Sequence, residues 1–144
     1  MAFVLIPAAI VLPLDLGIDF VGGHTYEKVK GEIPESDVAI QLTANQFNWN
    51  STYPGPDSEF GTTDDLTLES TLHVPVGKPV RVNLRSEDVI HSFFVPVLRL
   101  KQDVVPGQEI PTWFEIAETG AYEIACTEQC GFGHSGMRGF LLRG

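Results

Sequence analysis

The stretch DVAIQLTANQFNW, residues 37–49, alternates apolar and polar side chains with a period of two. Val38, Ile40, Leu42 and Ala44 fall on one side, which is typical of a half-buried β-strand. Similar short stretches follow: LTLESTLHV, PVRVNLRS, HSFFVPVL, IPTWFEI, GAYEIAC and MRGFLLR. Turn residues separate such stretches at intervals of roughly eight to twelve residues. The pattern predicts an all-β sandwich or barrel.

The charge of the chain limits its partners. Its 144 residues include 19 acidic and 9 basic side chains, for a formal net charge of −10. Nucleic acid is not expected as a partner, since phosphate binding requires clustered Lys and Arg. An acidic surface can attract a basic protein partner toward the domain, or it can serve only to keep the domain soluble. The hydrophobic content of 43% suits one domain with a substantial core.

The N-terminal segment has a different composition. Residues 3–14, FVLIPAAIVLPL, are almost wholly apolar, and Asp15 and Asp19 then interrupt the run. A run of this length is too short to span a bilayer, which needs about twenty residues, and two prolines disfavour a helix. A basic start and a small-residue cleavage site, the marks of a signal peptide, are not found. The segment is expected to be an edge strand, a loop in the core, or the end of a transmembrane helix.

The residues suited to metal chemistry lie in CTEQCGFGHSGM, residues 126–137, which holds both cysteines of the chain. Imidazole, thiolate and thioether ligands together point first to copper, and a blue-copper site uses two His, one Cys and a weak Met. Cys130, His134 and Met137 supply three of these ligands. His91, in DVIHSFFVP, is a candidate for the fourth, from a distant strand edge.

Cys126 is then in excess for a single copper ion. A disulfide between Cys126 and Cys130 would close a very small loop and gain little chain entropy. If both thiolates instead bridge two metal ions, each ion has two sulfurs and one histidine. Met137 then serves as a weak ligand to one ion, and the backbone carbonyl of Glu128 to the other.

A closed zinc site is the alternative for the same loop. Zinc has little use for a methionine, and its structural sites more often show Cys-x2-Cys spacing. His24 and His73 stand apart from the loop in sequence, and both are expected to be structural or solvent-facing.

The same residues resemble a known family. SEDVIHSFFVPVLRLKQDVVPG, residues 86–107, and GAYEIACTEQCGFGHSGMRG, residues 120–139, resemble the dinuclear copper (CuA) domain of cytochrome c oxidase subunit II. The family pattern runs Asp-x-x-His, Lys-x-Asp-x-x-Pro-Gly and Cys-x-Glu-x-Cys-Gly-x-x-His-x-x-Met, and every element is present. The resemblance implies a cupredoxin-like Greek-key β-sandwich. It also implies a set of copper ligands: His91, Cys126, the carbonyl of Glu128, Cys130, His134 and Met137.

The resemblance implies electron transfer as the function. A dinuclear copper centre would accept electrons from cytochrome c or another small redox protein and pass them to heme in the oxygen-reducing catalytic subunit of a respiratory terminal oxidase. The domain would thus belong to an enzyme without itself reducing oxygen. Magnesium would bind the carboxylate of Glu128 only at the subunit interface of the intact complex, where Lys101 and Asp103 are also expected. Two alternatives are the CuA domain of a nitrous oxide reductase, with an aromatic residue at position 128, and a mononuclear cupredoxin shuttle.

The resemblance also divides the chain. Residues 1–20 are expected to be the end of a transmembrane helix, residues 21–37 a connector, and residues 38–144 the CuA domain. The parent protein would be membrane-anchored, with this domain on the periplasmic or extracytoplasmic face.

One strand departs from the family pattern. The family usually has Gln-Trp-x-Trp, whose first Trp admits electrons, whereas QFNW places Phe47 there and Trp49 second. Phe47, and then Trp49, are therefore the expected points where electrons enter. Phe47 is expected to be independent of the ligand loop, so that its removal leaves the copper spectrum unchanged. Asp88 matches one acidic docking position of the family, and uncharged neighbours of Phe47 predict weak charge pairing with the donor: Asn45, Gln46 and Asn48.

Overall fold

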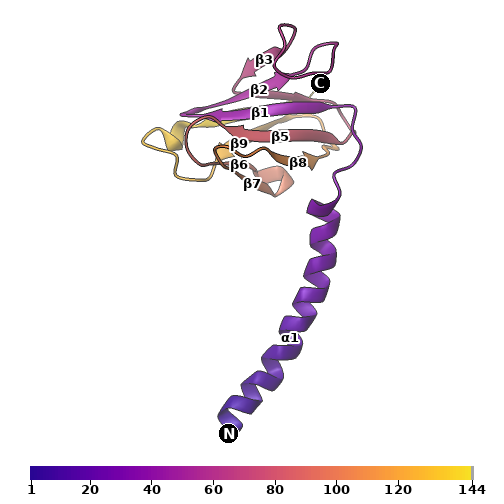
Figure 1. The fold of residues 1–144 in the computed structure, drawn as a ribbon, viewed down its shortest axis with the longest axis vertical. Helices are drawn as coiled ribbons and strands as arrows, with labels where there is room; N and C mark the ends of the chain where they lie inside the picture. Colours follow the sequence, from indigo (N-terminus) through magenta and orange to yellow (C-terminus); the bar gives the residue numbers. More distant parts are fainter. Residues whose placement is uncertain (144) are drawn as a thin grey trace. The chain divides into compact units, whose positions relative to one another are not determined.

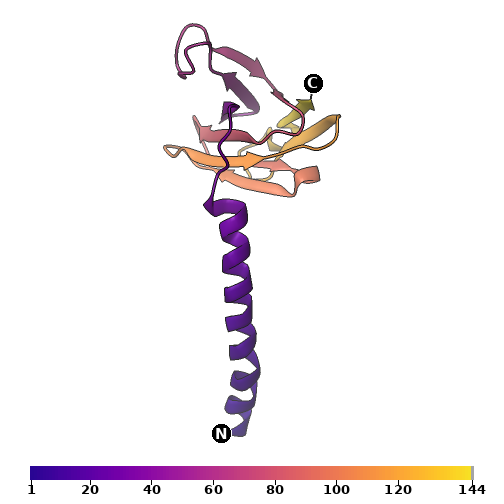
Figure 2. The same ribbon diagram turned by 90° about the vertical axis from the view of Figure 1, so that its right-hand side faces the viewer.

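The structure, a computed structural model, describes residues 1–143, without the side chain of Arg143. Gly144, the last residue of the predicted domain, lies outside the described residues. The chain divides into two units, Met1–Ile33 and Pro34–Gly144. The first unit is helical, and the second is built mainly of β-strands (Figures 1 and 2).

The strands of the second unit form two five-stranded sheets over the described residues. One sheet has the order β3 (Leu66–Glu69), β2 (Asn48–Tyr53), β1 (Ala39–Asn45), β5 (Val80–Ser86) and β8 (Ile110–Phe114). The other has the order β4 (Thr71–Val74), β10 (Arg138–Arg143), β9 (Ala121–Cys126), β6 (His91–Val95) and β7 (Leu100–Val104). Each sheet contains one parallel pair, β1 with β5 and β10 with β4. The predicted all-β sandwich is confirmed.

Alternation along the strands fills the space between the sheets. In β1 the side chains of Ile40, Leu42 and Ala44 are buried, as their spacing predicts. Their neighbours in β5 repeat the pattern, and the facing sheet supplies the other half of the core: Leu72, Phe93, Val95, Ile124 and Leu141. Two short 3-10 helices, η2 (Pro96–Leu98) and η3 (His134–Gly136), lie in the connections. The core therefore joins both sheets into one rigid support for the loops at its ends.

The stretch 66–74, which alternates without a break in sequence, is two strands in the structure. Ser70 adopts a left-handed φ of 55° between them, so β3 belongs to one sheet and β4 to the other. The backbone of Ser70 donates to the carbonyl of Trp49 at 2.7 Å and accepts from the amide of Phe140 at 2.8 Å. Ser70 is thus a corner that ties the two sheets together, which period-two alternation cannot reveal.

The N-terminal segment is a helix, α1 (Ala2–Tyr26), with a π-helical turn, η1 (Glu27–Gly31), after it. The expectation of an edge strand or a core loop is wrong, and Pro7 and Pro13 lie inside the helix. None of its residues is buried, and it is long and apolar enough to cross a membrane by length and composition. It also continues past residue 20, where the sequence suggested an end, because residues 15–21 are mostly apolar and Gly22-Gly23 does not stop it.

Candidate metal centre

The candidate metal loop leaves the sandwich at the end of β9 and returns as β10. Figure 1 shows it in yellow-orange at one end of the sandwich. Its base is closed by two hydrogen bonds, from the amide of Cys126 to the carbonyl of Met137 at 3.4 Å and from the amide of Thr127 to the carbonyl of Ser92 at 3.1 Å. Gly131 turns the chain with a φ of +137°, a conformation that favours glycine. The twelve residues 126–137 are thereby folded back on themselves.

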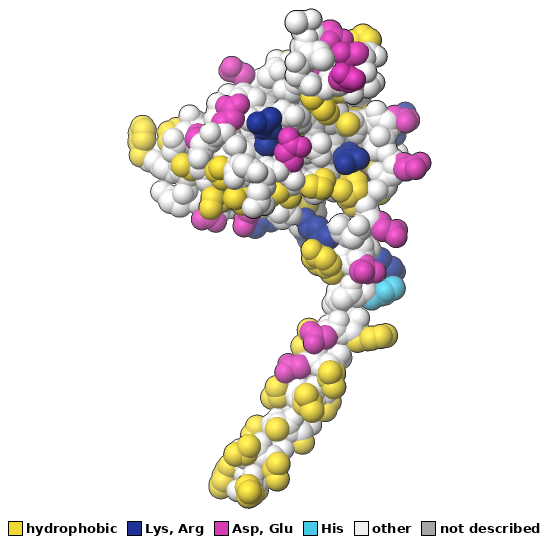
Figure 3. All heavy atoms as spheres, viewed as in Figure 1, with side chains coloured by type: hydrophobic (Ala, Val, Ile, Leu, Met, Phe, Trp, Pro, Cys, Tyr) yellow, Lys and Arg dark blue, Asp and Glu magenta, His cyan; other side chains and the backbone are white. Residues whose placement is uncertain are grey.

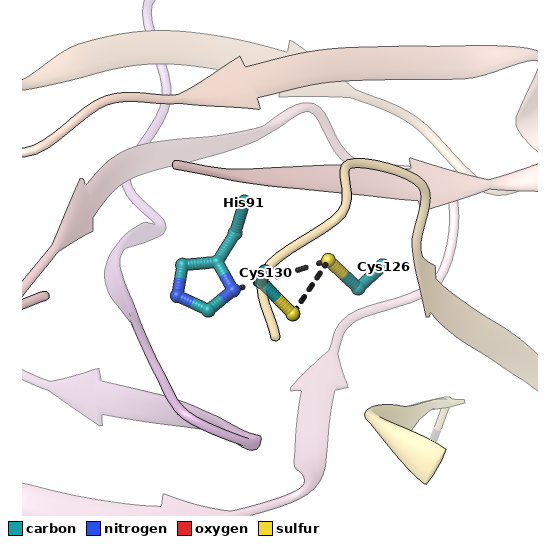
Figure 4. Close-up of side chains that lie close together, drawn as sticks. All are labelled: His91, Cys126 and Cys130. Atoms are coloured by element: carbon teal, nitrogen blue, oxygen red, sulfur yellow. Dashed lines mark hydrogen bonds between the residues drawn. The ribbon is translucent and has the colours of Figure 1, made fainter. Parts of the chain in front are cut away.

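Both cysteines are buried and free. Their Sγ atoms lie 3.8 Å apart, well beyond the length of about 2.05 Å that a disulfide requires. Figure 4 shows the side chains of Cys126, Cys130 and His91 converging. The donor atoms of these three residues all lie within 4.8 Å of one another, so a pair of thiols forms the middle of the site.

The remaining donors surround this pair of sulfurs. The His91 Nδ1 lies 3.9 Å from the Cys126 Sγ, and the His134 Nδ1 lies 3.6 Å from the Cys130 Sγ. The Cys126 thiol donates to the Glu128 carbonyl at 3.3 Å, and the Met137 Sδ lies 3.8 Å from the Cys130 Sγ. All six residues predicted as ligands therefore meet in one place. Their role as ligands stays a prediction.

The chemistry of these donors fits copper better than zinc. A buried thioether beside two thiols and two imidazoles is a soft set, which Cu(I) accepts readily and which a structural zinc site does not use. Two central sulfurs with one imidazole beside each also exceed what a single blue-copper ion needs. The set therefore fits copper, and the number of ions that it holds stays a prediction.

His91 is fixed from behind by Asp88. The His91 Nε2 and Asp88 Oδ1 are 2.7 Å apart, which leaves Nδ1 to face the thiols. Asp88 also accepts the amide protons of Gln46 and Val89, each at 2.6 Å. Burial opposes the charge of Asp88, but hydrogen bonds from His91, Val89 and Gln46 outweigh it and lower the pKa of that carboxyl.

These contacts revise the docking role expected for Asp88. Its side chain is 28% exposed, and both carboxylate oxygens already accept hydrogen bonds inside the domain. Orientation of His91 is therefore its better supported task, and contact with a donor stays an untested prediction.

Phe47 lies directly against the metal loop, contrary to the expectation that it is independent of it. A methyl group placed on Gly133 would come within 2.5 Å of the Phe47 ring, and one on Gly131 within 3.1 Å. The neighbouring Gln46 side chain donates to the carbonyl of Cys130 at 2.5 Å. The turn between β1 and β2 thus braces the loop from one side.

Trp49, the second residue expected to admit electrons, is only 1% exposed. Its ring lies edge-on to His91, with centroids 6.2 Å apart, and to Phe93 at 5.8 Å. Its burial excludes contact with a docked protein, so Trp49 belongs to the core behind the metal site. His24 and His73 are both exposed, in agreement with the expectation that they are structural or solvent-facing.

Sequence reasoning missed Phe132. Its side chain is 98% exposed, and its ring lies edge-on to that of Phe47 with centroids 5.6 Å apart. The signal was present in the sequence as an aromatic residue between two glycines inside the ligand loop.

Comparison with known proteins places this geometry in a family. The family model described as cytochrome c oxidase subunit II, periplasmic domain, matches residues 39–141. The chain belongs to this subunit II family. The periplasmic domain of subunit II of cytochrome oxidase of Bradyrhizobium japonicum is similar in structure, with a TM-score of 0.69 and 30% identity, covering 78% of this chain and 88% of that one. The cupredoxin-like fold expected for subunit II is thereby confirmed.

Subunit II relatives in other organisms are longer. The alternative cytochrome c oxidase subunit 2 of Bradyrhizobium diazoefficiens is 34% identical over 132 residues, which cover 76% of this chain and 48% of the relative. The cytochrome c oxidase subunit 2 of Thermostichus vulcanus is 41% identical over 111 residues, which cover 76% of this chain and 30% of the relative. The chain therefore spans half or less of these relatives.

Replacing Asp88 with alanine is expected to weaken copper binding by about 10- to 100-fold, the usual effect of losing the partner of a metal-bound histidine. A competition titration against a copper chelator measures this. Glu87→Gln, which removes the adjacent exposed acid, is the control and should bind copper normally. If Asp88→Ala binds copper like the control but reacts more slowly with a donor protein, the docking role is correct instead.

Gly133→Ala should lower stability by about 1–3 kcal/mol, because its methyl group collides with the Phe47 ring in a packed site. In a Phe47→Ala background the same change should cost much less, since the obstacle is gone. Gly136→Ala has open space around it and serves as the control in the same loop. Thermal unfolding of the four variants measures the coupling, and equal costs of Gly133→Ala in both backgrounds would show that Phe47 does not brace the loop.

Copper binding should tighten as pH rises. Burial, with the nearby Cys126 thiol, raises the pKa of Cys130 to about 11, so this thiol is protonated at neutral pH and must lose its proton to bind metal. Apparent affinity should then increase by about tenfold per pH unit for each proton displaced. Competition titrations at several pH values below 9 test this, and an affinity independent of pH would contradict it.

Proposed function

We propose that this chain carries a dinuclear copper centre and transfers electrons within a terminal oxidase. The observation that supports it most strongly is the pair of thiol sulfurs 3.8 Å apart, with an imidazole nitrogen within 3.9 Å of one and 3.6 Å of the other. Membership of the subunit II family agrees with this function. The proposed function includes assembly of this chain, as one subunit, into a complete terminal oxidase.

Each donor has a distinct task in this proposal. Cys126 and Cys130 would bridge both copper ions, and His91 and His134 would each bind one. The Met137 sulfur and the Glu128 carbonyl would complete the set as weak ligands. Copper would supply a centre that gains and loses one electron, and sharing that electron between two ions would spread the change in charge. The chain's own contribution is to hold the donors still, because the less they move between oxidation states, the less each transfer costs.

The sandwich is suited to this task. His91 begins the buried strand β6, and Cys126 ends β9, its partner in the sheet. Asp88 fixes the orientation of one histidine, and the β1–β2 turn braces the loop that carries the other. No open coordination position or general base is needed, because electrons rather than atoms are exchanged.

The partners follow from the same proposal. Electrons would arrive from cytochrome c or another small redox protein and leave to heme in the catalytic subunit that reduces oxygen. The exposed carboxylate of Glu128 would meet magnesium only at the interface with that subunit. Lys101 and Asp103, paired at 2.9 Å near the buried Ser92, are expected at the same interface.

We also propose that α1 anchors the chain, with the β-domain on the periplasmic or extracytoplasmic side. The helix is long and apolar, and its residues are exposed. The proposed order along the chain is still the end of a helix, a connector and the CuA domain. The helical part, however, extends to Gly31.

The thiols must be reduced before copper binds. A related subunit II has been captured in a mixed disulfide with a thioredoxin-like protein. We propose a similar reduction step for Cys126 and Cys130, because their close sulfur atoms need only a modest movement to form a disulfide that would block the site.

The full chain loaded with copper in detergent should contain two copper ions per chain. Its oxidised form should show an EPR spectrum with more hyperfine lines than one copper ion can give. Cys126→Ser should abolish that spectrum, because one bridging sulfur is lost, whereas Ser135→Ala in the same loop should retain it. One copper per chain would indicate a mononuclear cupredoxin, and a colourless zinc protein would indicate a structural site. If Cys126→Ser retained two copper ions that share one unpaired electron, the bridging role of Cys126 would be refuted.

A further inference from the structure

An apolar surface lies at the end of the sandwich beside the metal loop. This surface, the apolar tip, consists of Phe132, Phe47, Val89 and Ile90. The Phe47 and Phe132 rings are in edge-on contact. Val89 and Ile90 are exposed on the adjoining loop, which Asp88 ties to Gln46 at 2.6 Å. Three segments far apart in sequence therefore come together at this end of the sandwich.

Phe132 is the outermost part of the apolar tip. Its side chain is 98% exposed, and Phe47, by contrast, is half-buried beneath it. Within the described part of the chain, the ring contact with Phe47 is the one aromatic contact of Phe132. A large aromatic ring held in water contributes little to the fold, and such exposed apolar groups often mark contact sites.

Two of the three segments that meet at the apolar tip lack charged residues. Residues 45–56 and 129–137 contain no Asp, Glu, Lys or Arg, in a chain with 19 acidic and 9 basic residues. Acidic groups lie at its rim, at Glu87, Asp88 and Glu128, and Asp88 is engaged in internal hydrogen bonds. Figure 3 shows hydrophobic side chains at the end of the domain formed by the metal loop, and acidic clusters over other parts of this face. The centre of the tip thus suits an apolar partner surface.

The apolar tip is also adjacent to the metal site through the chain itself. Phe132 stands two residues from Cys130 and two from His134. The Phe47 ring, on which it rests, covers the backbone at Gly131 and Gly133. A protein touching Phe132 is therefore in contact with the loop that carries five of the six proposed ligands.

We propose that the electron donor docks on the apolar tip, with Phe132 as its central contact and an apolar patch around the donor's own cofactor as the matching surface. This inference rests on the proposed electron-transfer function. It moves the decisive contact from position 47, where the family pattern places it, to the metal loop. Aromatic side chains at the centre of an interface commonly dominate its binding energy, and acidic rim groups mainly alter the association rate.

The test uses the copper-loaded full chain in detergent and two reduced probes in stopped-flow experiments. Azurin presents an apolar patch over its copper, and cytochrome c presents lysines around its heme edge. Phe132→Ala should slow reduction by azurin about tenfold. The ratio of the native rate to the variant rate should be the same at about 20 mM and about 300 mM ionic strength, because salt does not screen an apolar contact. Phe132→Trp should restore the rate, and Phe132→Asp should not.

Two controls separate docking from damage. Phe140→Ala removes another phenylalanine, 51% exposed in β10 and outside the apolar tip, and should leave the azurin rate unchanged. The EPR spectrum and the rate of reduction by dithionite should be the same in all variants. A change in sedimentation of Phe132→Ala would instead identify the tip as a contact between copies of the chain and overturn the proposal.

The remaining outcomes are decisive in either direction. A Phe132→Ala rate within twofold of native, or a loss confined to cytochrome c at low salt, overturns the docking proposal and leaves the electron-transfer function intact. A native chain that binds no copper, or that neither probe can reduce, overturns the function and the docking proposal with it.

Discussion

The pairing of β6 with β9 is the constraint on which the metal site depends. It places Phe93 opposite Cys126, so His91 begins its strand close to the first thiol. The hydrogen bond from the amide of Thr127 to the carbonyl of Ser92 extends this pairing into the loop. A slip of one residue would turn His91 to the other face of the sheet. The buried side chains on both strands, Phe93 and Ile124 among them, oppose such a slip.

Strand alternation carried most of the information about the fold. It identified the buried face of β1 and the all-β class, because each strand has one face in the core. It did not reveal the corner at Ser70, since a left-handed residue leaves the apolar pattern on both sides unchanged. The end of a helix was expected at the N-terminus, but its full length was not, because only the twelve apolar residues before Asp15 were counted and two prolines argued against a helix. Helices in an apolar setting tolerate prolines.

The site was predictable from the types and spacing of its residues, since few metals accept thiols, imidazoles and a thioether together. The surroundings were not predictable in the same way. Spacing along the chain cannot show that Trp49 is buried, that Asp88 holds His91, or that Phe47 rests on the ligand loop. Each of these depends on which segments meet at the end of the sandwich. The exposure of Phe132 and its contact with the Phe47 ring likewise emerge only when the loop is folded.

The close fit of the Phe47 ring against Gly131 and Gly133 limits how the loop 126–137 can be exchanged between related proteins. The ring occupies the space that side chains at those positions would need. A larger indole at position 47 would require a differently shaped loop, so the two segments should vary together during evolution. Transplanting residues 126–137 into another sandwich would carry over five of the six donors but not the hairpin beneath them. A successful graft would therefore need the β1–β2 turn of the same parent.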